Sequence, residues 1–276
     1  MKEKYRRILN TLTIDVEEWY QTVLFCNDGE KYSQGSNLEE NVREILFLLK
    51  KYKAIATFFI VGSVAEKYPR LVQEIKDDGH EIATHGYSHV SVNKLSQKEF
   101  ISDVRRSIES LAGITKEEVW GYRAPTWSIT KEMPWAIDVL SSIGLKYDSS
   151  IYPVGLNFPE KECIPYKIRD NLFEFPPSIF KAVFCNFPYA GGTFLRFLPL
   201  KFIKNRIAQI NYKGYTAMIY FHSWEFDREI PYAGISLWKR FVQYQNVHSV
   251  RYKIESLLND FRFTSIKEQM SLNALA

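Results

Sequence analysis

The chain has 276 residues, of which 46% are hydrophobic and 25% are charged, an ordinary globular composition that can bury a large core. Its net charge of +4 comes from 36 basic and 32 acidic residues scattered along the chain. A nucleic-acid binder usually concentrates its basic residues in a patch or stripe, so this pattern argues against nucleic acid as a partner.

The cysteines and the N-terminus exclude further classes. Cys26, Cys163 and Cys185 are odd in number and widely spaced, which argues against a disulfide framework, and no CxxC pair suggests a zinc ribbon. The opening MKEKYRR lacks the apolar stretch of a signal peptide, and no run of eighteen apolar residues suggests a transmembrane helix. We therefore expect a cytoplasmic protein.

Strand-like and helix-like segments alternate along the first two thirds of the chain, which predicts an α/β fold with a largely parallel sheet. At this length, a single domain over residues 1–276 is expected, since α/β barrels commonly use this many residues. The predicted strands cover residues 8–16, 54–61, 80–84, 119–122 and 147–151, and the predicted helices cover residues 41–52, 65–78, 96–112 and 130–143.

The pattern changes after residue 152. Pro, Gly and aromatic residues dominate residues 153–199, which predicts a loop-rich elaboration. A helix over 201–210, a strand over 216–221 and a helical region over 238–260 follow, and we expect the last ten residues to be loose.

Two histidines and three carboxylates follow predicted strands. His85 and His89 are four residues apart in THGYSH, and on a helical turn that spacing places both imidazoles on one face, as a divalent metal requires. Asp15, Glu17 and Glu18 crowd the end of the first strand, where a bound cation would offset their mutual repulsion. A solvated turn is the alternative interpretation of the acidic segment.

Arg123 and His222 also follow strands. The Arg123 guanidinium, in GYRAPTW, could clamp a carboxylate such as that of Asp15. The His222 imidazole, in MIYFHSWE, could protonate a leaving amine near neutral pH. Taken singly, each residue is more often structural.

Together and in this order, these motifs resemble the polysaccharide deacetylase family, the NodB-homology carbohydrate esterases (family 4). The resemblance covers roughly residues 12–224, and the phrases ATFFIVG, GHEIATHGYSH, GYRAPTWSIT, YDSSIYP and YFHSWE look closest to a branch found with exopolysaccharide synthesis loci. It implies a distorted (β/α) barrel of about seven strands, with a divalent metal, most commonly zinc, at the mouth of the barrel. The implied activity is removal of an acyl group, normally acetyl, from an amino sugar.

The resemblance also implies roles for individual residues. His85 and His89 match the two histidine ligands of the metal, and Asp15 matches the catalytic base. Arg123 matches the arginine that orients this base, and His222 matches the general acid.

The third metal ligand departs from the family pattern, because Val16 stands where the family has its second aspartate. Side chains two apart on a strand share a face, so we assign the ligand role to Glu17, beside Asp15. Glu18 stays open as the alternative ligand.

Three further positions lie in family-like phrases. The backbone N–H of Thr126 matches the donor that helps to form the oxyanion hole, and Trp127 is expected to wall the acyl pocket. Asp148 either tunes His222 or forms a turn.

Two other functions stay open at this point. An allantoinase-like hydrolase of cyclic amides would share the fold but need a small closed pocket, and residues 158–199 should decide this. A non-catalytic sugar-binding barrel is the other, favoured by Val16. The expected substrate is an N-acetylated sugar, lipid-linked or nucleotide-linked, and the aromatic and basic residues of 178–204 either rest peripherally on the inner face of a membrane or pack across the barrel.

Overall fold

The computed structural model describes residues 8–22, 37–154, 163–181, 186–228 and 236–272. Cys26 and Cys185 lie outside the described residues, so the absence of a disulfide framework stays a prediction.

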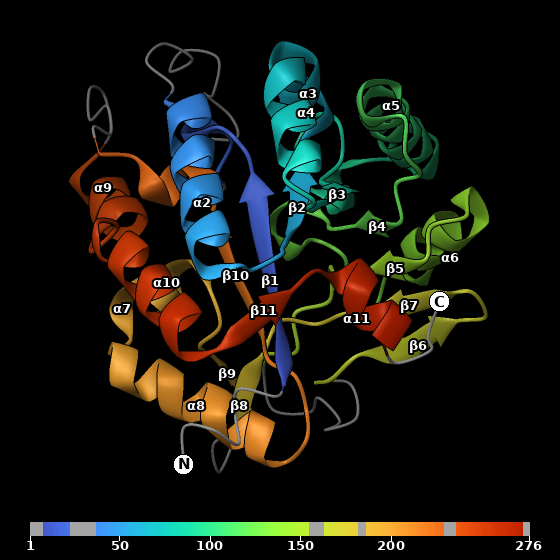
Figure 1. The fold of residues 1–276 in the computed structure, drawn as a ribbon. Coiled ribbons are helices and arrows are strands. Elements are labelled where there is room, and N and C mark those ends of the chain that lie inside the picture. The colour runs from blue at the N-terminus through green and yellow to red at the C-terminus, as the bar shows by residue number, and fades with distance from the viewer. Residues whose placement is uncertain (1–7, 23–36, 155–162, 182–185, 229–235, 273–276) are drawn as a thin grey trace.

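A nine-stranded sheet forms the centre of the fold (Figure 1). Its order is β10–β1–β2–β3–β4–β5–β7–β6, and β11 pairs with the start of β1. All neighbouring strands are parallel except β6 and β7. The strands are β1 (Leu9–Val16), β2 (Thr57–Ile60), β3 (Glu81–Thr84), β4 (Gly121–Tyr122), β5 (Tyr147–Asp148), β6 (Tyr166–Arg169), β7 (Leu172–Glu174), β10 (Met218–His222) and β11 (Arg262–Thr264). A separate hairpin consists of β8 (Ile179–Lys181) and β9 (Asn186–Pro188).

Helices such as α2 and α10 pack on the outside of the sheet, whereas α11 packs against Phe59 and Tyr147 on its inner side (Figure 1). The α-helices are α2 (Leu38–Tyr52), α3 (Gly62–Lys67), α4 (Pro69–Asp77), α5 (Gln97–Thr115), α6 (Pro134–Ile143), α7 (Gly192–Phe197), α8 (Leu200–Tyr212), α9 (Leu237–Tyr244), α10 (Ser249–Asp260) and α11 (Ile266–Leu272). Short 3-10 turns are η1 (Trp19–Gln21), η3 (Val92–Lys94), η4 (Pro125–Trp127) and η6 (Ser223–Phe226).

Alternation along β1 separates the core from the site. Leu12, Ile14 and Val16 face the main hydrophobic cluster under the helices, whereas Thr13 and Asp15 face the inside of the curled sheet. Val16 therefore packs in the core, which explains an apolar residue at that position.

The sheet curls without closing into a regular barrel. At the outer edge of β10, the backbone N–H of Ser178 donates to Met218 O at 3.3 Å, and Gly191 forms a single bridge to Tyr220. The α/β prediction of a distorted (β/α) barrel is confirmed, with seven parallel strands running from β10 to β7.

One predicted helix is wrong in its extent. The helix expected over residues 65–78 is two helices, α3 and α4, which meet at Tyr68 and Pro69. Pro69 has no backbone N–H and stands in the first turn of α4, so the chain restarts there instead of continuing. In contrast, the capping box of Ser96 and Glu99 at the start of α5 is present as predicted.

The C-terminal segment is more ordered than predicted. The expectation that the last ten residues are loose is wrong as far as Leu272, because α11 buries Ile266 and Met270 against the sheet. Residues 153–199 contain β6 to β9 and α7 within their described parts.

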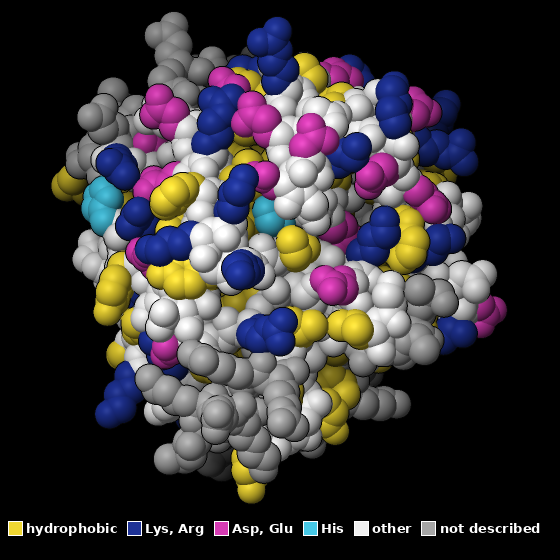
Figure 2. Space-filling model, viewed as in Figure 1, with side chains coloured by type: hydrophobic (Ala, Val, Ile, Leu, Met, Phe, Trp, Pro, Cys, Tyr) yellow, Lys and Arg dark blue, Asp and Glu magenta, His cyan; other side chains and the backbone are white. Residues whose placement is uncertain are grey.

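Charges of both signs are interspersed over the face seen in Figure 2. Pairs such as Arg43 with Glu74, at 2.9 Å, and Lys51 with Glu255, at 2.8 Å, cross between neighbouring helices. None of the helices in the described stretches is both long enough and apolar enough to span a bilayer.

Candidate active site

Three of the predicted metal ligands lie together at the carboxyl ends of β1 and β3. The ligand atoms of Glu17, His85 and His89 all lie within 4.8 Å of one another. Glu17 Oε2 is 2.5 Å from His89 Nε2 and 3.8 Å from His85 Nε2, and all three side chains are buried. One carboxylate oxygen and two imidazole nitrogens are thus directed at one small volume, as a divalent cation requires.

The HxxxH segment reaches this geometry without a helix, which corrects the expected helical turn. Residues 85–89 form a loop in which Gly86 has φ of 73° and His89 has φ of 56°. The two positive φ angles reverse the chain and bring the rings of His85 and His89 to a centroid distance of 5.1 Å.

Neighbouring donors and acceptors orient two of these ligands. His85 Nδ1 lies 2.7 Å from the carbonyl oxygen of Arg123, so Nδ1 carries the proton and Nε2 is left as the ligand. The Trp224 indole donates to Glu17 Oε1 at 3.0 Å, which leaves Oε2 to face the imidazoles. Glu18 points elsewhere, toward Lys67 at 2.9 Å and the Tyr68 hydroxyl at 3.1 Å.

The protonation states suit a metal site. Burial would raise the pKa of Glu17, but His89, His222 and His85 outweigh burial and lower this pKa to about 2. Burial is also the main reason why the pKa of His85 falls to about 4. Glu17 is therefore ionised and His85 neutral at neutral pH, the forms in which both bind metals.

Asp15 lies beside the three ligands and is clamped by Arg123. The guanidinium donates to Asp15 Oδ1 at 2.7 Å and to Thr13 Oγ1 at 2.9 Å, and Ser149 accepts from it through both its carbonyl and its hydroxyl. Arg123 is fully buried, and its carbon Cζ lies 4.1 Å from the centroid of the Phe59 ring. Because every side of Arg123 is occupied, the carboxylate of Asp15 is held in one orientation.

His222 faces the other oxygen of Asp15, at 3.9 Å from Nε2 to Oδ2. Its side chain is 19% exposed, so this edge of the site is open to solvent. Glu225, which the sequence interpretation missed, accepts from both His222 Nδ1 (3.1 Å) and the His222 backbone N–H (2.9 Å). Arg196 Nε, from α7, lies 3.2 Å from the other oxygen of Glu225.

Glu225 sets the charge of His222. Burial would lower the pKa of His222, but the hydrogen bond and charge of Glu225, aided by Glu17 and Asp15, raise it to about 9. His222 is therefore protonated at neutral pH and able to donate from Nε2. The i, i+3 spacing of His and Glu in the phrase HSWE was the signal that could have revealed this partner.

Asp148, considered in the sequence as the residue that tunes His222, contacts other groups. It accepts a short hydrogen bond from Ser150 and lies beside Glu174 on the next strand. Burial raises the pKa of both carboxyls, so the pair holds a proton. The Ser150 hydroxyl also accepts from the backbone N–H of Ala124 at 2.8 Å, so this pair supports the loop after β4.

That loop carries the predicted oxyanion donor. Thr126 and Trp127 have φ of 58° and 55°, an unusual backbone for a β-branched and a bulky residue. Trp127 stacks on Tyr152 at 4.9 Å and meets Tyr220 edge-on at 5.0 Å, so an aromatic wall lines this side of the site.

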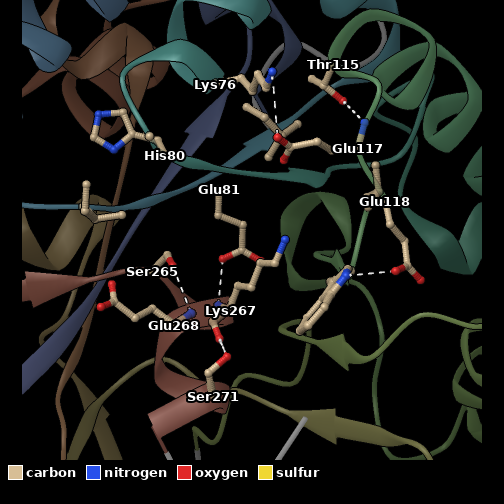
Figure 3. Close-up of a pocket in the computed structure, with 15 residues that line it drawn as sticks. Lys76, His80, Glu81, Thr115, Glu117, Glu118, Ser265, Lys267, Glu268 and Ser271 are labelled. Atoms are coloured by element: carbon tan, nitrogen blue, oxygen red, sulfur yellow. Dashed lines mark hydrogen bonds and ion pairs between the residues drawn. The ribbon is translucent and has the colours of Figure 1, made fainter.

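A second group of ionisable residues lies at the opposite ends of the strands. These residues line a cavity of about 410 Å³ (Figure 3). In it, the carboxyl group of Glu81, at the start of β3, accepts a hydrogen bond from the backbone N–H of Lys267 at 2.9 Å. His80 packs against Phe58, and burial lowers its pKa to about 4. The cavity is separated from the catalytic candidates by the length of the strands.

Comparison with known proteins supports the family. The profile of the polysaccharide deacetylase family matches residues 22–147, and a domain of unknown function (DUF3473) matches residues 149–271. A peptidoglycan deacetylase from Helicobacter pylori is 34% identical over 134 residues, 48% of this chain and 41% of that protein. A peptidoglycan-N-acetylglucosamine deacetylase from Bacillus cereus is 32% identical over 141 residues, 46% of this chain and 51% of that protein. The chain thus spans about half the length of these curated relatives, or less.

Solved structures share the fold over nearly the whole chain. A Mycobacterium smegmatis protein assigned to the polysaccharide deacetylases gives a TM-score of 0.62 at 20% identity, covering 96% of this chain and 91% of that chain. A family 4 pseudoenzyme from Bacillus anthracis gives a TM-score of 0.53 at 14% identity, covering 94% of this chain and 64% of that chain. The fold therefore includes inactive proteins, so activity has to be argued from the site. The family profile, the curated relatives and the shared fold thus agree in likening residues 22–147 of this chain to the polysaccharide deacetylase domain.

Proposed function

We propose that the chain is a metal-dependent hydrolase that removes an N-acyl group, normally acetyl, from an amino sugar of a polysaccharide or of its carrier-linked precursor. One observation carries the proposal. Asp15 and His222, a clamped carboxylate and a protonated imidazole, face each other at 3.9 Å directly beside the Glu17, His85 and His89 cluster. A base and an acid next to three converging ligand atoms are the parts that amide hydrolysis needs.

Glu17 Oε2, His85 Nε2 and His89 Nε2 would hold the cation, and the donor set fits zinc or another divalent transition metal. Such an ion supplies Lewis acidity toward the acyl oxygen and lowers the pKa of water. Glu18 is engaged by Lys67 and Tyr68, which favours Glu17 over Glu18 as the third ligand.

The chain's own residues divide the remaining work. Asp15 accepts a proton from the attacking water, and Arg123 keeps this carboxylate oriented for that transfer. The backbone N–H of Thr126 contributes to the oxyanion hole, and Trp127 walls the acyl pocket. His222 then gives its Nε2 proton to the departing amine, because Glu225 holds it in the charged form.

We also propose that the whole chain forms one catalytic domain. Asp15, Glu17, His85 and His89 come from the first half, whereas His222 comes from the segment that matches the domain of unknown function. Strands from both halves lie side by side in one sheet, with Asp15 in register with His222, which supports this proposal.

Acetate release tests the proposal. Purified protein with added zinc should release acetate from N-acetylglucosamine oligomers or from a lipid- or nucleotide-linked N-acetyl sugar, and a chelator should abolish the reaction. Asp15→Asn should lose about 10²- to 10⁴-fold in kcat while it keeps the rise in Tm on zinc addition.

Two other outcomes would replace the proposal. Hydrolysis of a cyclic amide without acetate release would make the chain an allantoinase-like enzyme. If the chain binds sugar oligomers but turns over no substrate even with zinc present, it is a non-catalytic barrel of the kind that the Bacillus anthracis neighbour represents. The cytoplasmic location stays a prediction, which fractionation of cells that contain the tagged chain would test.

A further inference from the structure

Helix α9 exposes its apolar side. Leu237, Trp238 and Phe241 are 82%, 71% and 50% exposed, whereas Gln243 and Tyr244 on the other side of the helix are buried. A surface helix of a globular protein normally buries its apolar stripe and exposes its polar residues. The orientation of α9 is the reverse of that arrangement.

Helix α7 extends the same apolar surface. The ring centroids of Phe197 and Phe241 lie 6.2 Å apart, and Trp238 stacks on Phe241 at the same centroid distance. Phe194 is one turn before Phe197 and is also exposed. These five residues, Phe194, Phe197, Leu237, Trp238 and Phe241, form one continuous patch, here called the aromatic patch. A contiguous exposed apolar surface of this kind marks an interaction site.

The inner sides of the same two helices form a wall of the candidate active site. Arg196 of α7 contacts Glu225, the partner of His222, and Tyr244 of α9 packs on Trp224 at 6.3 Å. At the start of α7, a Cβ on Gly191 would lie 2.1 Å from the Tyr220 carbonyl oxygen, so only glycine allows this close approach. A partner on the aromatic patch would therefore lie next to the open, His222 edge of the site.

The two helices of the patch and the next helix along the chain contain basic but no acidic residues. Helices α7, α9 and α8, which follows α7 directly, contain no Asp or Glu. They contain six basic residues, one in α7, three in α8 and two in α9, of which Arg196 pairs with Glu225 and Lys204 with Asp260. Elsewhere the surface mixes both signs, as Figure 2 shows for the face over α2 and α4. A partner that covers this region is expected to be apolar at its centre and anionic around it.

We infer that the aromatic patch rests on an anionic phospholipid bilayer. Trp, Phe and Leu on an amphipathic helix, accompanied by Lys and Arg, are the composition that inserts shallowly at the lipid headgroup level. Anionic lipids add attraction for the basic residues. A glycan fits less well, because among the five patch side chains only the Trp238 indole can form a hydrogen bond. If the proposed deacetylase function holds, the contact places His222 where a lipid-linked sugar is presented.

Vesicle flotation tests the contact without any reference to catalysis. The full chain is mixed with vesicles of phosphatidylcholine alone or of phosphatidylcholine with phosphatidylglycerol, and the bound fraction is measured. The wild-type chain should float with the anionic vesicles, and a Trp238→Ser/Phe241→Ser double variant should partition about tenfold less, equivalent to about 1.4 kcal/mol. The matched control is Phe47→Ser on α2, which removes an aromatic ring that is 63% exposed outside the patch and should float like the wild type.

Each other outcome overturns the inference. One is a wild-type chain that stays in the soluble fraction, and another is a double variant that floats as well as the wild type. The third is a wild-type dimer that the double variant converts to monomer, which would make the patch a self-association surface. Leu237→Ser serves as a second variant, since a side chain that is 82% exposed can be replaced without loss of the fold. Acetate release from a soluble oligomer should be unchanged in the patch variants, so failure of the enzyme proposal and failure of the membrane proposal give different results.

Discussion

Two buried glutamates at opposite ends of the sheet have opposite surroundings. Glu81, at the start of β3, accepts from the hydroxyls of Thr57 (2.5 Å) and Tyr147 (2.8 Å) and from a backbone N–H, and burial raises its pKa. Glu17, just beyond the end of β1, has one neutral donor, the Trp224 indole, and its other oxygen faces two imidazoles.

The comparison separates a structural carboxyl group from a candidate ligand. Neutral donors complete the surroundings of Glu81, so it needs no further partner. Glu17 has an oxygen that shares a small buried volume with two ring nitrogens, an arrangement that a cation would complete. Burial alone does not distinguish the two residues, but the chemistry of their partners does.

The largest effect is expected when Glu17 is replaced. Glu17→Gln removes the anionic ligand but keeps the hydrogen bond from Trp224, so the protein should lose both acetate release and metal retention. Thermal unfolding with and without zinc measures this, since an ion at 100 times its Kd stabilises the fold by about 2.7 kcal/mol. Glu18→Gln is the matched control and should keep the zinc-dependent shift. A Glu18→Gln variant that loses the shift while Glu17→Gln retains it would reverse the ligand assignment.

The second effect concerns the acid side of the site. Glu225→Gln keeps an acceptor near His222 but removes the charge that keeps the imidazole protonated, so kcat should fall by up to about 100-fold, within the range that general acid catalysis contributes. KM and the zinc-dependent rise in Tm should not change, because neither Glu225 nor His222 is among the three clustered ligands. An unchanged kcat would remove Glu225 from the mechanism.

A smaller effect is expected at the other end of the sheet. Glu81→Gln replaces an acceptor of three hydrogen bonds by an amide that satisfies only part of them, which should cost about 1 to 3 kcal/mol of unfolding free energy. Denaturant unfolding measures this loss, and kcat with saturating zinc should equal that of the wild type. A defect in zinc retention would show that the two ends of the sheet are coupled.

The helices, the strands and the local contacts of the site could be predicted from the sequence, but the long-range partners of the site residues could not. The period-2 pattern of β1 was enough to place Asp15 and Glu17 on one face and Val16 in the core. Arg196 could not be found in this way, because it approaches Glu225 from a different helix and only tertiary packing fixes that distance. The predicted conformation of the HxxxH segment was wrong for a related reason. Residue spacing suggested a helical turn, whereas the positive φ of Gly86 and His89 is set by the surrounding fold.

The smallest effect, a change in how stability depends on pH, tests the electrostatics of His222 in the metal-free protein. The folded pKa of His222 is raised to about 9 from its ordinary value of 6.5, so folding favours the protonated ring. This contribution to stability is complete below pH 6.5, declines as pH rises, and is lost above pH 9. The Tm of the wild-type chain in chelator should therefore fall across this window more steeply than that of Glu225→Gln, whose His222 lacks the main group that raises its pKa. His248→Gln, which replaces an exposed imidazole, should retain the wild-type slope. Equal slopes in the wild type and Glu225→Gln would mean that the two side chains do not interact as the structure describes, and the charge on the general acid would need another source.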